Sequence, residues 1–177
     1  MVLILIPILI GVYVWILYNK LARLRNDLET SKSQLATELL RRHDLIPSLV
    51  ETVRGYASHE SETLEAVIQA RAAATSSQAP DIGTENMLTS ALGKLIALNE
   101  SYPNLKADQS FISLQRELSD IENRLNLSRR IFNETVNIYN KTQQTFPAVL
   151  VASRIGHQKA ELFQAPEGSD SRPEFRF

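Results

Sequence analysis

Four consecutive residues with titratable side chains, Arg41-Arg42-His43-Asp44, stand directly before Leu45-Ile46-Pro47. Two guanidinium groups beside an imidazole suit a contact surface for the acidic groups of a partner. The alternative is structural, because Arg and His complement the dipole at a helix C-terminus and Asp44 or Ser48 can cap the following helix. In that case the arginines would form ion pairs inside the fold, with a carboxylate partner from Glu51, Glu117 or Glu122.

A second series of polar side chains lies toward the C-terminal end of the chain, where Asn126, Asn133 and Asn140 repeat every seven residues with Asn137 between them. Asparagine buried between helices hydrogen-bonds across the interface and fixes its register. The alternative is a solvated helix face. The candidate partner contacts are therefore Arg41, Arg42, His43, Asp44, Asn133, Asn137 and Asn140.

The histidines offer little metal or acid–base chemistry. They are far apart in the chain, and none stands in a paired metal-ligand spacing. His59-Glu60 with Glu62 could bind a metal, but adjacent helical residues point in different directions, which favours the solvated start of a helix. The alternative function is a membrane-localised hydrolase or metal-dependent enzyme that uses His43, Asp44, His59 or Glu60. We predict no catalytic residue, no metal ligand and no cofactor.

The composition excludes further classes of chemistry. The chain of 177 residues has no Cys, so thiol nucleophiles, disulfides, iron–sulfur clusters and cysteine-ligated zinc are absent. A formal net charge of −1 argues against the positive field that general nucleic-acid binding needs, and we expect no nucleic-acid partner. With six Gly residues and no Gly-rich loop, phosphate-binding and hydrolase signatures are missing as well.

The first residues predict a membrane segment. Residues 2–18 carry no charge, and twelve of these seventeen positions are Val, Ile or Leu. On the insertion scale these aliphatic residues contribute about −4 to −7 kcal/mol, enough to carry Pro7 and Gly11. Seventeen helical residues rise about 25 Å, the short limit for one span. A cleaved signal peptide would need a basic start and small residues at a cleavage point, and the sequence has neither.

The charges around this segment predict its orientation. Lys20, Arg23 and Arg25 follow the span, and Tyr13, Trp15 and Tyr18 lie near the same end. Because positive residues stay on the cytoplasmic side, we expect a single-pass protein of the inner cell membrane. Its N-terminus would lie outside and its C-terminal body in the cytoplasm.

The rest of the chain is predicted to be all-α. Leu21, Leu24, Leu28, Leu35 and Leu39 form a heptad stripe, so the transmembrane helix continues into a soluble amphipathic one. We expect this helix to bend sharply near residues 43–46, before Pro47. A second helix is predicted over 47–76 with a weak joint at Gly55 and Ser58.

The last two bundle helices follow from caps and periodicity. A third helix is predicted after an N-cap at Thr84, and a long fourth one from Asp108 to Thr145. Short connections between long helices favour an antiparallel four-helix bundle. We therefore divide the chain into an anchor (1–18), a helical bundle (19–147), a short apolar segment (148–160) and a disordered tail (161–177).

Several short segments occur in a characteristic order along the chain. The first is Arg41-Arg42-His43-Asp44-Leu45-Ile46-Pro47, which continues through Leu49 to Ala57. The others are Glu62 to Val67, Tyr102 to Ala107, Leu114 to Leu118, Glu122 to Arg124, Ser128 to Arg130, Phe132-Asn133, Tyr139-Asn140 and Phe146-Pro147. In these segments and their spacing the sequence resembles the bacterial LemA family, over about residues 18–160. The family resemblance implies an N-terminal membrane helix, a cytoplasmic helical bundle and no established enzyme activity.

The sequence thus predicts a membrane-anchored protein-interaction or scaffolding module rather than an enzyme. Its expected partner is another membrane or membrane-associated protein, with a peptidase or an envelope-stress component as candidates, or a second copy in a homo-oligomer. The long charged helix faces and the absence of catalytic motifs support this interpretation.

Overall fold

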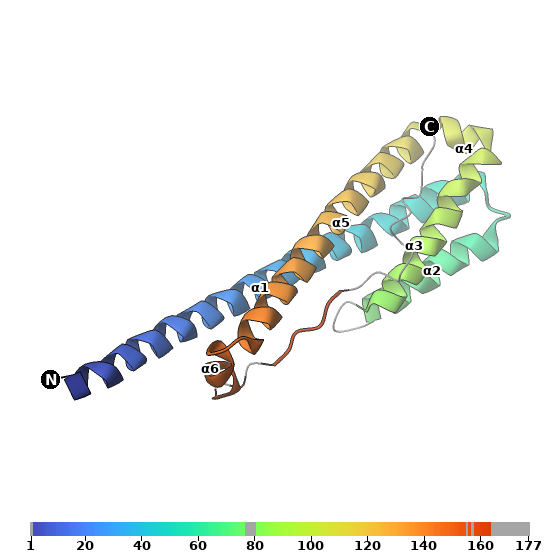
Figure 1. The fold of residues 1–177 in the computed structure, drawn as a ribbon. Helices are drawn as coiled ribbons and strands as arrows, with labels where there is room; N and C mark the ends of the chain where they lie inside the picture. Colours follow the sequence, from blue (N-terminus) through green and yellow to red (C-terminus); the bar gives the residue numbers. More distant parts are fainter. Residues whose placement is uncertain (1, 77–80, 155, 157, 164–177) are drawn as a thin grey trace. The chain divides into compact units, whose positions relative to one another are not determined.

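The computed structural model describes residues 2–76, 81–154, 156 and 158–163. These residues form helices and no strand, which confirms the all-α prediction (Figure 1). The elements are α1 (Val2–Tyr56), α2 (Ser61–Ser76), α3 (Ile82–Ala97), a 3-10 turn η1 (Leu98–Glu100), α4 (Pro103–Ala107), α5 (Gln109–Gln144) and α6 (Ala148–Arg154).

The chain divides into two compact units, to which α1 and α5 both contribute. The bundle unit comprises residues 36–126, and the terminal unit comprises residues 2–35 together with 127–163. This division differs from the predicted single bundle over 19–147, because the two longest helices each leave one unit and enter the other.

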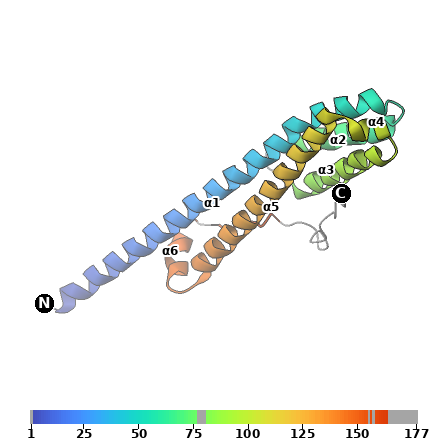
Figure 2. The same cartoon turned by 90° about the horizontal axis from the view of Figure 1, so that it is seen from above.

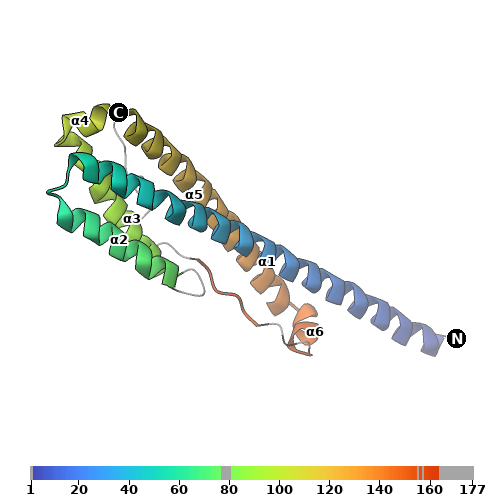
Figure 3. The same ribbon diagram turned by 180° about the vertical axis from the view of Figure 1, so that it is seen from behind.

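The bundle unit is a four-helix bundle. The C-terminal part of α1, then α2, α3 and the first part of α5 lie side by side, with α2 antiparallel to α1 and α3 antiparallel to α2 (Figure 3). Its core is apolar and uses the periodic positions of each helix. The core includes Ile46, Leu49, Val53, Leu64, Val67, Leu88, Leu95, Leu105, Phe111 and Ile121.

The terminal unit pairs the first part of α1 with the last part of α5, and α6 lies beside them (Figure 2). Leu21, Leu28 and Leu35 of the predicted stripe are buried here, as are Val136 and Tyr139 of α5. By contrast, large apolar side chains between Leu5 and Tyr18 are about half exposed. By length and composition, α1 is the one described helix apolar enough to cross a membrane.

The predicted bend before Pro47 is wrong, since α1 continues as a helix to Tyr56. Proline lacks an N–H group, so residue 47 cannot donate the usual helical hydrogen bond to the carbonyl oxygen of residue 43. That oxygen has another partner, because Arg71 Nε of α2 donates to the His43 carbonyl at 2.7 Å. The helix therefore tolerates an internal proline because a guanidinium group from a neighbouring helix replaces the missing amide.

Other helix ends differ from the predictions in detail. The weak joint becomes a full reversal, because α1 ends at Tyr56 and α2 begins at Ser61. The N-cap of α3 is Asp81 rather than Thr84, whose amide donates to Asp81 Oδ2 at 2.9 Å. Asp108 caps α5 as predicted, accepting a hydrogen bond from the Phe111 amide at 2.8 Å.

The chain after α5 contains a short helix and a segment that lies against α5. The apolar segment predicted over 148–160 contains α6, in which Ala148 and Ala152 are buried. Residues 161–163, the start of the predicted disordered tail, hold a defined position, and Phe163 is buried. The remainder of that tail, residues 164–177, lies outside the described residues.

The proline–arginine pairing yields a double-mutant test. Replacing Arg71 with Met leaves the His43 carbonyl without a donor, so we expect the free energy of unfolding to fall by about 1–3 kcal/mol. In a Pro47→Ala background the restored backbone amide supplies the bond, and the same replacement should cost less than half as much. Urea unfolding of the full-length chain in mild detergent, followed by far-UV circular dichroism, measures both. Arg54→Met, on the exposed side of α1, is the control; equal losses in both backgrounds would contradict the pairing.

Candidate functional site

Arg42 is the centre of a buried polar network in the bundle unit. Its side chain is fully buried and forms an ion pair with the buried carboxylate of Glu85 on α3. Arg42 Nη1 also donates to Thr89 Oγ1 and to Glu122 Oε1, each at 3.0 Å. One guanidinium group thus joins α1 to α3 and α5, and such charge-assisted hydrogen bonds are stronger than neutral ones.

Glu85 also binds His43, a second residue of the charged run Arg41-Arg42-His43-Asp44. His43 Nε2 lies 3.0 Å from Glu85 Oε1, so the two carboxylate oxygens face different residues of α1. Burial alone would raise the pKa of Glu85, but the hydrogen bond to His43 and the charges of Arg42 and His43 outweigh it. The pKa of Glu85 is therefore held below its ordinary value, and the carboxylate stays ionised at neutral pH.

The structure divides the predicted charged run between core and surface. Arg42 and His43 are buried, whereas Arg41 and Asp44 are exposed. Arg41 approaches Glu38 of its own helix at 3.4 Å, which is a surface pair of small energetic value. The ion-pairing alternative thus describes Arg42, with Glu122 as one of its two carboxylate partners.

Glu85 and Thr89 are not among the site residues predicted from the sequence. The available signal was an acidic residue in register with buried apolar ones, since Glu85 stands three residues before Leu88 on α3. A carboxylate at such a position requires a cationic partner in the core. The cation itself lies 43 residues earlier, too far for periodicity to identify.

The asparagines of the terminal unit bind the C-terminal segment 158–163. Asn133 Nδ2 donates to the Phe163 carbonyl, and the Phe163 amide donates to Asn133 Oδ1, both at 2.8 Å. Asn140 makes the same pair of bonds with Ala160, at 2.8 and 2.9 Å. Each side-chain amide therefore holds both backbone groups of one residue, as a neighbouring strand would.

The other asparagines lie elsewhere. Asn137 is exposed between these two on α5, and Asn126 is exposed within the bundle unit. The structure therefore brings together two of the three predicted asparagine contacts. From the sequence we expected these asparagines either to face solvent or to bind a partner helix. Instead, Asn133 and Asn140 bind residues 158–163 of the same chain.

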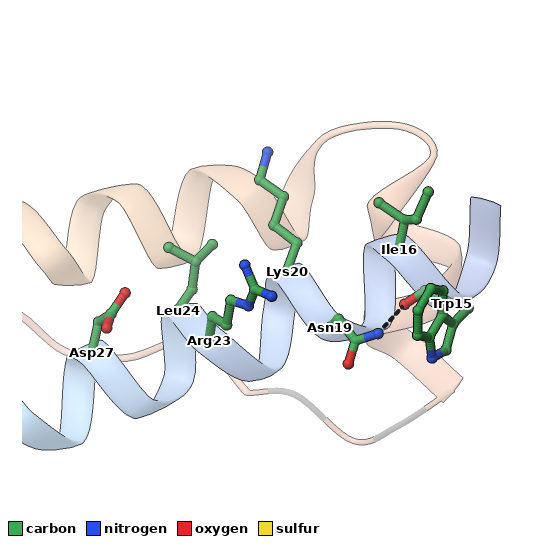
Figure 4. Close-up of a pocket in the computed structure, with 7 residues that line it drawn as sticks. All are labelled: Trp15, Ile16, Asn19, Lys20, Arg23, Leu24 and Asp27. Carbon is green, nitrogen blue, oxygen red and sulfur yellow. Dashed lines mark hydrogen bonds between the residues drawn. The ribbon is translucent and has the colours of Figure 1, made fainter. Parts of the chain in front are cut away.

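A shallow hollow lies along an exposed part of α1 where its apolar stretch ends (Figure 4). Trp15 and Ile16 line one end, and Lys20 and Arg23 follow toward Asp27. Asn19 Nδ2 donates to the Trp15 carbonyl at 3.0 Å within it. Aromatic and basic groups thus follow one another along the helix, an order typical of a membrane–water boundary.

The alternative metal or acid–base site does not assemble in the part of the chain that the structure describes. His43 contacts Glu85 in the bundle core, while His59 is exposed in the turn between α1 and α2. Glu60 accepts a hydrogen bond from the Tyr102 hydroxyl at 2.9 Å. Among the described residues, no group of three or more His, Asp or Glu side chains could hold a metal ion.

The lowered pKa of Glu85 predicts acid sensitivity. The pKa in the folded protein lies below the unfolded value of about 4.3. The ionised group therefore stabilises the fold above that value, and this stabilisation is lost as pH falls through the folded pKa. Glu85→Gln should lower the free energy of unfolding by about 3 kcal/mol at pH 7, because the Arg42 charge loses its buried partner.

The measurement is urea unfolding of full-length wild type and variant between neutral pH and about pH 3. The difference between the two proteins should shrink as the solution becomes acidic. Glu51→Gln, which removes an exposed carboxylate of the same unit, serves as the control. A constant difference across this range would show that Glu85 does not carry the acid sensitivity.

Comparison with known proteins identifies the family. The LemA family model matches residues 31–177 of the chain. Protein LemA of Metamycoplasma hominis is 25% identical over 152 residues, covering 84% of this chain and 69% of the relative. Magnetosome protein MamQ of Magnetospirillum gryphiswaldense and magnetosome protein MamQ 2 of Paramagnetospirillum magneticum are each 21% identical over 182 residues, covering 87% of this chain and 67% of the relative. The chain belongs to the LemA family.

Proposed function

We propose that this protein is a single-pass membrane protein whose helical body binds another protein at the membrane surface. The observation that carries the proposal is the first part of α1. Trp15 is 66% exposed and Leu9 63%, in a helical stretch without charge. In water such a surface would be unstable, and a lipid bilayer is the solvent that suits it.

The continuity of α1 supports a body held close to the membrane. The helix contains no break between the exposed apolar stretch and its end at Tyr56 in the bundle unit. Lys20 and Arg23 follow the aromatic residues at the end of that stretch. By the positive-inside rule, the proposed orientation has the N-terminus outside and the body in the cytoplasm, at the inner membrane.

Exposed apolar side chains on the last part of α5, in the terminal unit, favour an interaction role. Leu127, Ile131 and Ile138 of α5 are 58%, 41% and 47% exposed. Spacings of four and seven residues place them on one face of the helix. A partner helix or an extended segment could cover this face, and contiguous apolar surface of this kind marks interaction sites. The proposed partner is a membrane or membrane-associated protein, such as a peptidase or an envelope-stress component, or a second copy.

The orientation can be tested by cysteine labelling, because the chain contains no Cys of its own. A membrane-impermeant maleimide should label Met87→Cys, an exposed position of the bundle unit, only after the inner membrane is disrupted. Ile8→Cys should stay unlabelled until detergent is added, because lipid covers it. Labelling of Met87→Cys in intact spheroplasts would place the body outside the cytoplasm, and release of the protein by alkaline carbonate would contradict the membrane span.

The interaction role can be tested by photocrosslinking in cells. A photoreactive residue at Asn137 or Ile138 should yield a discrete protein adduct, because both positions are exposed on the last part of α5. The same residue at Met87, exposed on α3 of the bundle unit, is the control for random encounters. Adducts with protein at the same low level from all three positions would count against this face as the contact surface.

A further inference from the structure

The two asparagines of α5 recognise backbone rather than side chains. Asn133 and Asn140 each donate to a carbonyl and accept from an amide of a single residue, at 2.8–2.9 Å. Every residue except proline carries both of these backbone groups. The four hydrogen bonds therefore place almost no demand on the sequence of the bound segment.

The spacing of the asparagines suits an extended backbone. Seven helical residues separate them, a rise of about 10.5 Å. The residues that they hold, Ala160 and Phe163, are three apart. Three residues of an extended chain span about 9–10 Å, whether in polyproline II or strand geometry. The face of α5 is thus matched to an extended segment.

One side chain of the segment adds selectivity. Phe163 is buried, and the Arg129 guanidinium carbon lies 5.4 Å from the centre of its ring. Ala160 is half-buried, whereas Glu161 and Leu162 between them are exposed. A bound peptide therefore needs an aromatic residue three positions after the residue that Asn140 holds.

We propose that this face of α5 is a peptide-binding site that residues 158–163 of a second copy can occupy in place of the chain's own segment. Every copy carries both the site and a segment whose fit is shown here. The connection from α6 contains Gly156 at a φ of 70°, a conformation that favours glycine, so the segment follows a sharp local turn. Exchange of such a terminal segment between identical chains is a low-cost route to association.

The strength of the intramolecular contact is compatible with exchange. Five hydrogen bonds, including one from Gln143 Nε2 to the Gln158 carbonyl at 3.4 Å, and one buried ring hold the six residues. Ordering six residues costs free energy of a similar size. Copies anchored in one membrane meet at high local concentration, which favours docking between neighbours. The exposed side chains Leu127, Ile131 and Ile138 lie on the same part of α5, where a neighbour could cover them. The inference rests on the proposed interaction role and names a second copy as the partner.

Isotope mixing tests the site and the exchange together. Full-length protein with a diazirine-bearing phenylalanine at position 163 is prepared in heavy and light forms, which are mixed and reconstituted into phospholipid vesicles. Photocrosslinked peptides should join position 163 to the α5 region around Arg129 and Asn133. A share of them should join heavy to light, and this share should rise with the protein-to-lipid ratio.

Matched variants check the role of the asparagine amides. Asn133→Asp with Asn140→Asp replaces each donating amide by an oxygen facing a carbonyl, so the α5 adducts should fall about tenfold or more. Asn137→Asp makes the same chemical change at an exposed neighbouring position and should leave them unchanged. Equal effects from both changes would overturn the assignment of the site.

A complementation test removes the competing intramolecular contact. One copy carries the two Asn→Asp changes and keeps an intact segment, while a differently tagged copy carries Ala160→Pro and Phe163→Ala and keeps an intact site. The mixed pair should co-purify from detergent several-fold better than either variant with itself. Equal recovery of the mixed pair and of each variant with itself would overturn exchange. In the isotope experiment, an absence of crosslinks between heavy and light chains would do the same. Adducts of Asn137 with a different protein would still support the proposed interaction role.

Discussion

The burial of the Arg42 charge constrains the arrangement of the bundle. A guanidinium group removed from water must have carboxylate and hydrogen-bond partners nearby, or the cost of desolvation would unfold the unit. Glu85 of α3 and Glu122 of α5 provide the carboxylates, and Arg71 of α2 binds the carbonyl of the adjacent residue. The other three helices of the bundle therefore contact polar groups of α1 within one turn. These polar contacts connect specific residues of the four helices and so favour one register.

In the terminal unit, backbone groups likewise need hydrogen-bond partners. An extended segment lying against a helix has amide and carbonyl groups that no helix or sheet satisfies. Asn133 and Asn140 supply the complement through side chains that carry both a donor and an acceptor. In both units, polar side chains bind specific partners from another part of the chain.

The sequence predicted what depends on local periodicity. The stripe from Leu21 to Leu39 and the long fourth helix appear almost as expected, because burial of one helix face repeats every three or four residues. The prediction failed at Pro47, where the replacement donor, Arg71, lies on another helix. It also did not indicate that Phe163, within the tail predicted to be disordered, binds the side-chain amide of Asn133, because polar composition carries no sign of such a partner. The spacing of the asparagines was visible, but their ligand was not.

The internal proline of α1 has a consequence for local unfolding. In an uninterrupted helix, each turn is closed by amides of the same segment, so neighbouring helices can open independently. At residues 43–47 the closure comes from α2, and separation of α2 would remove the protein donor of the His43 carbonyl. Opening of α2 therefore weakens α1 at the position that holds Arg42 and His43. The amides of this turn and those of α2 should exchange with solvent deuterium as one cooperative group, although they belong to two different helices.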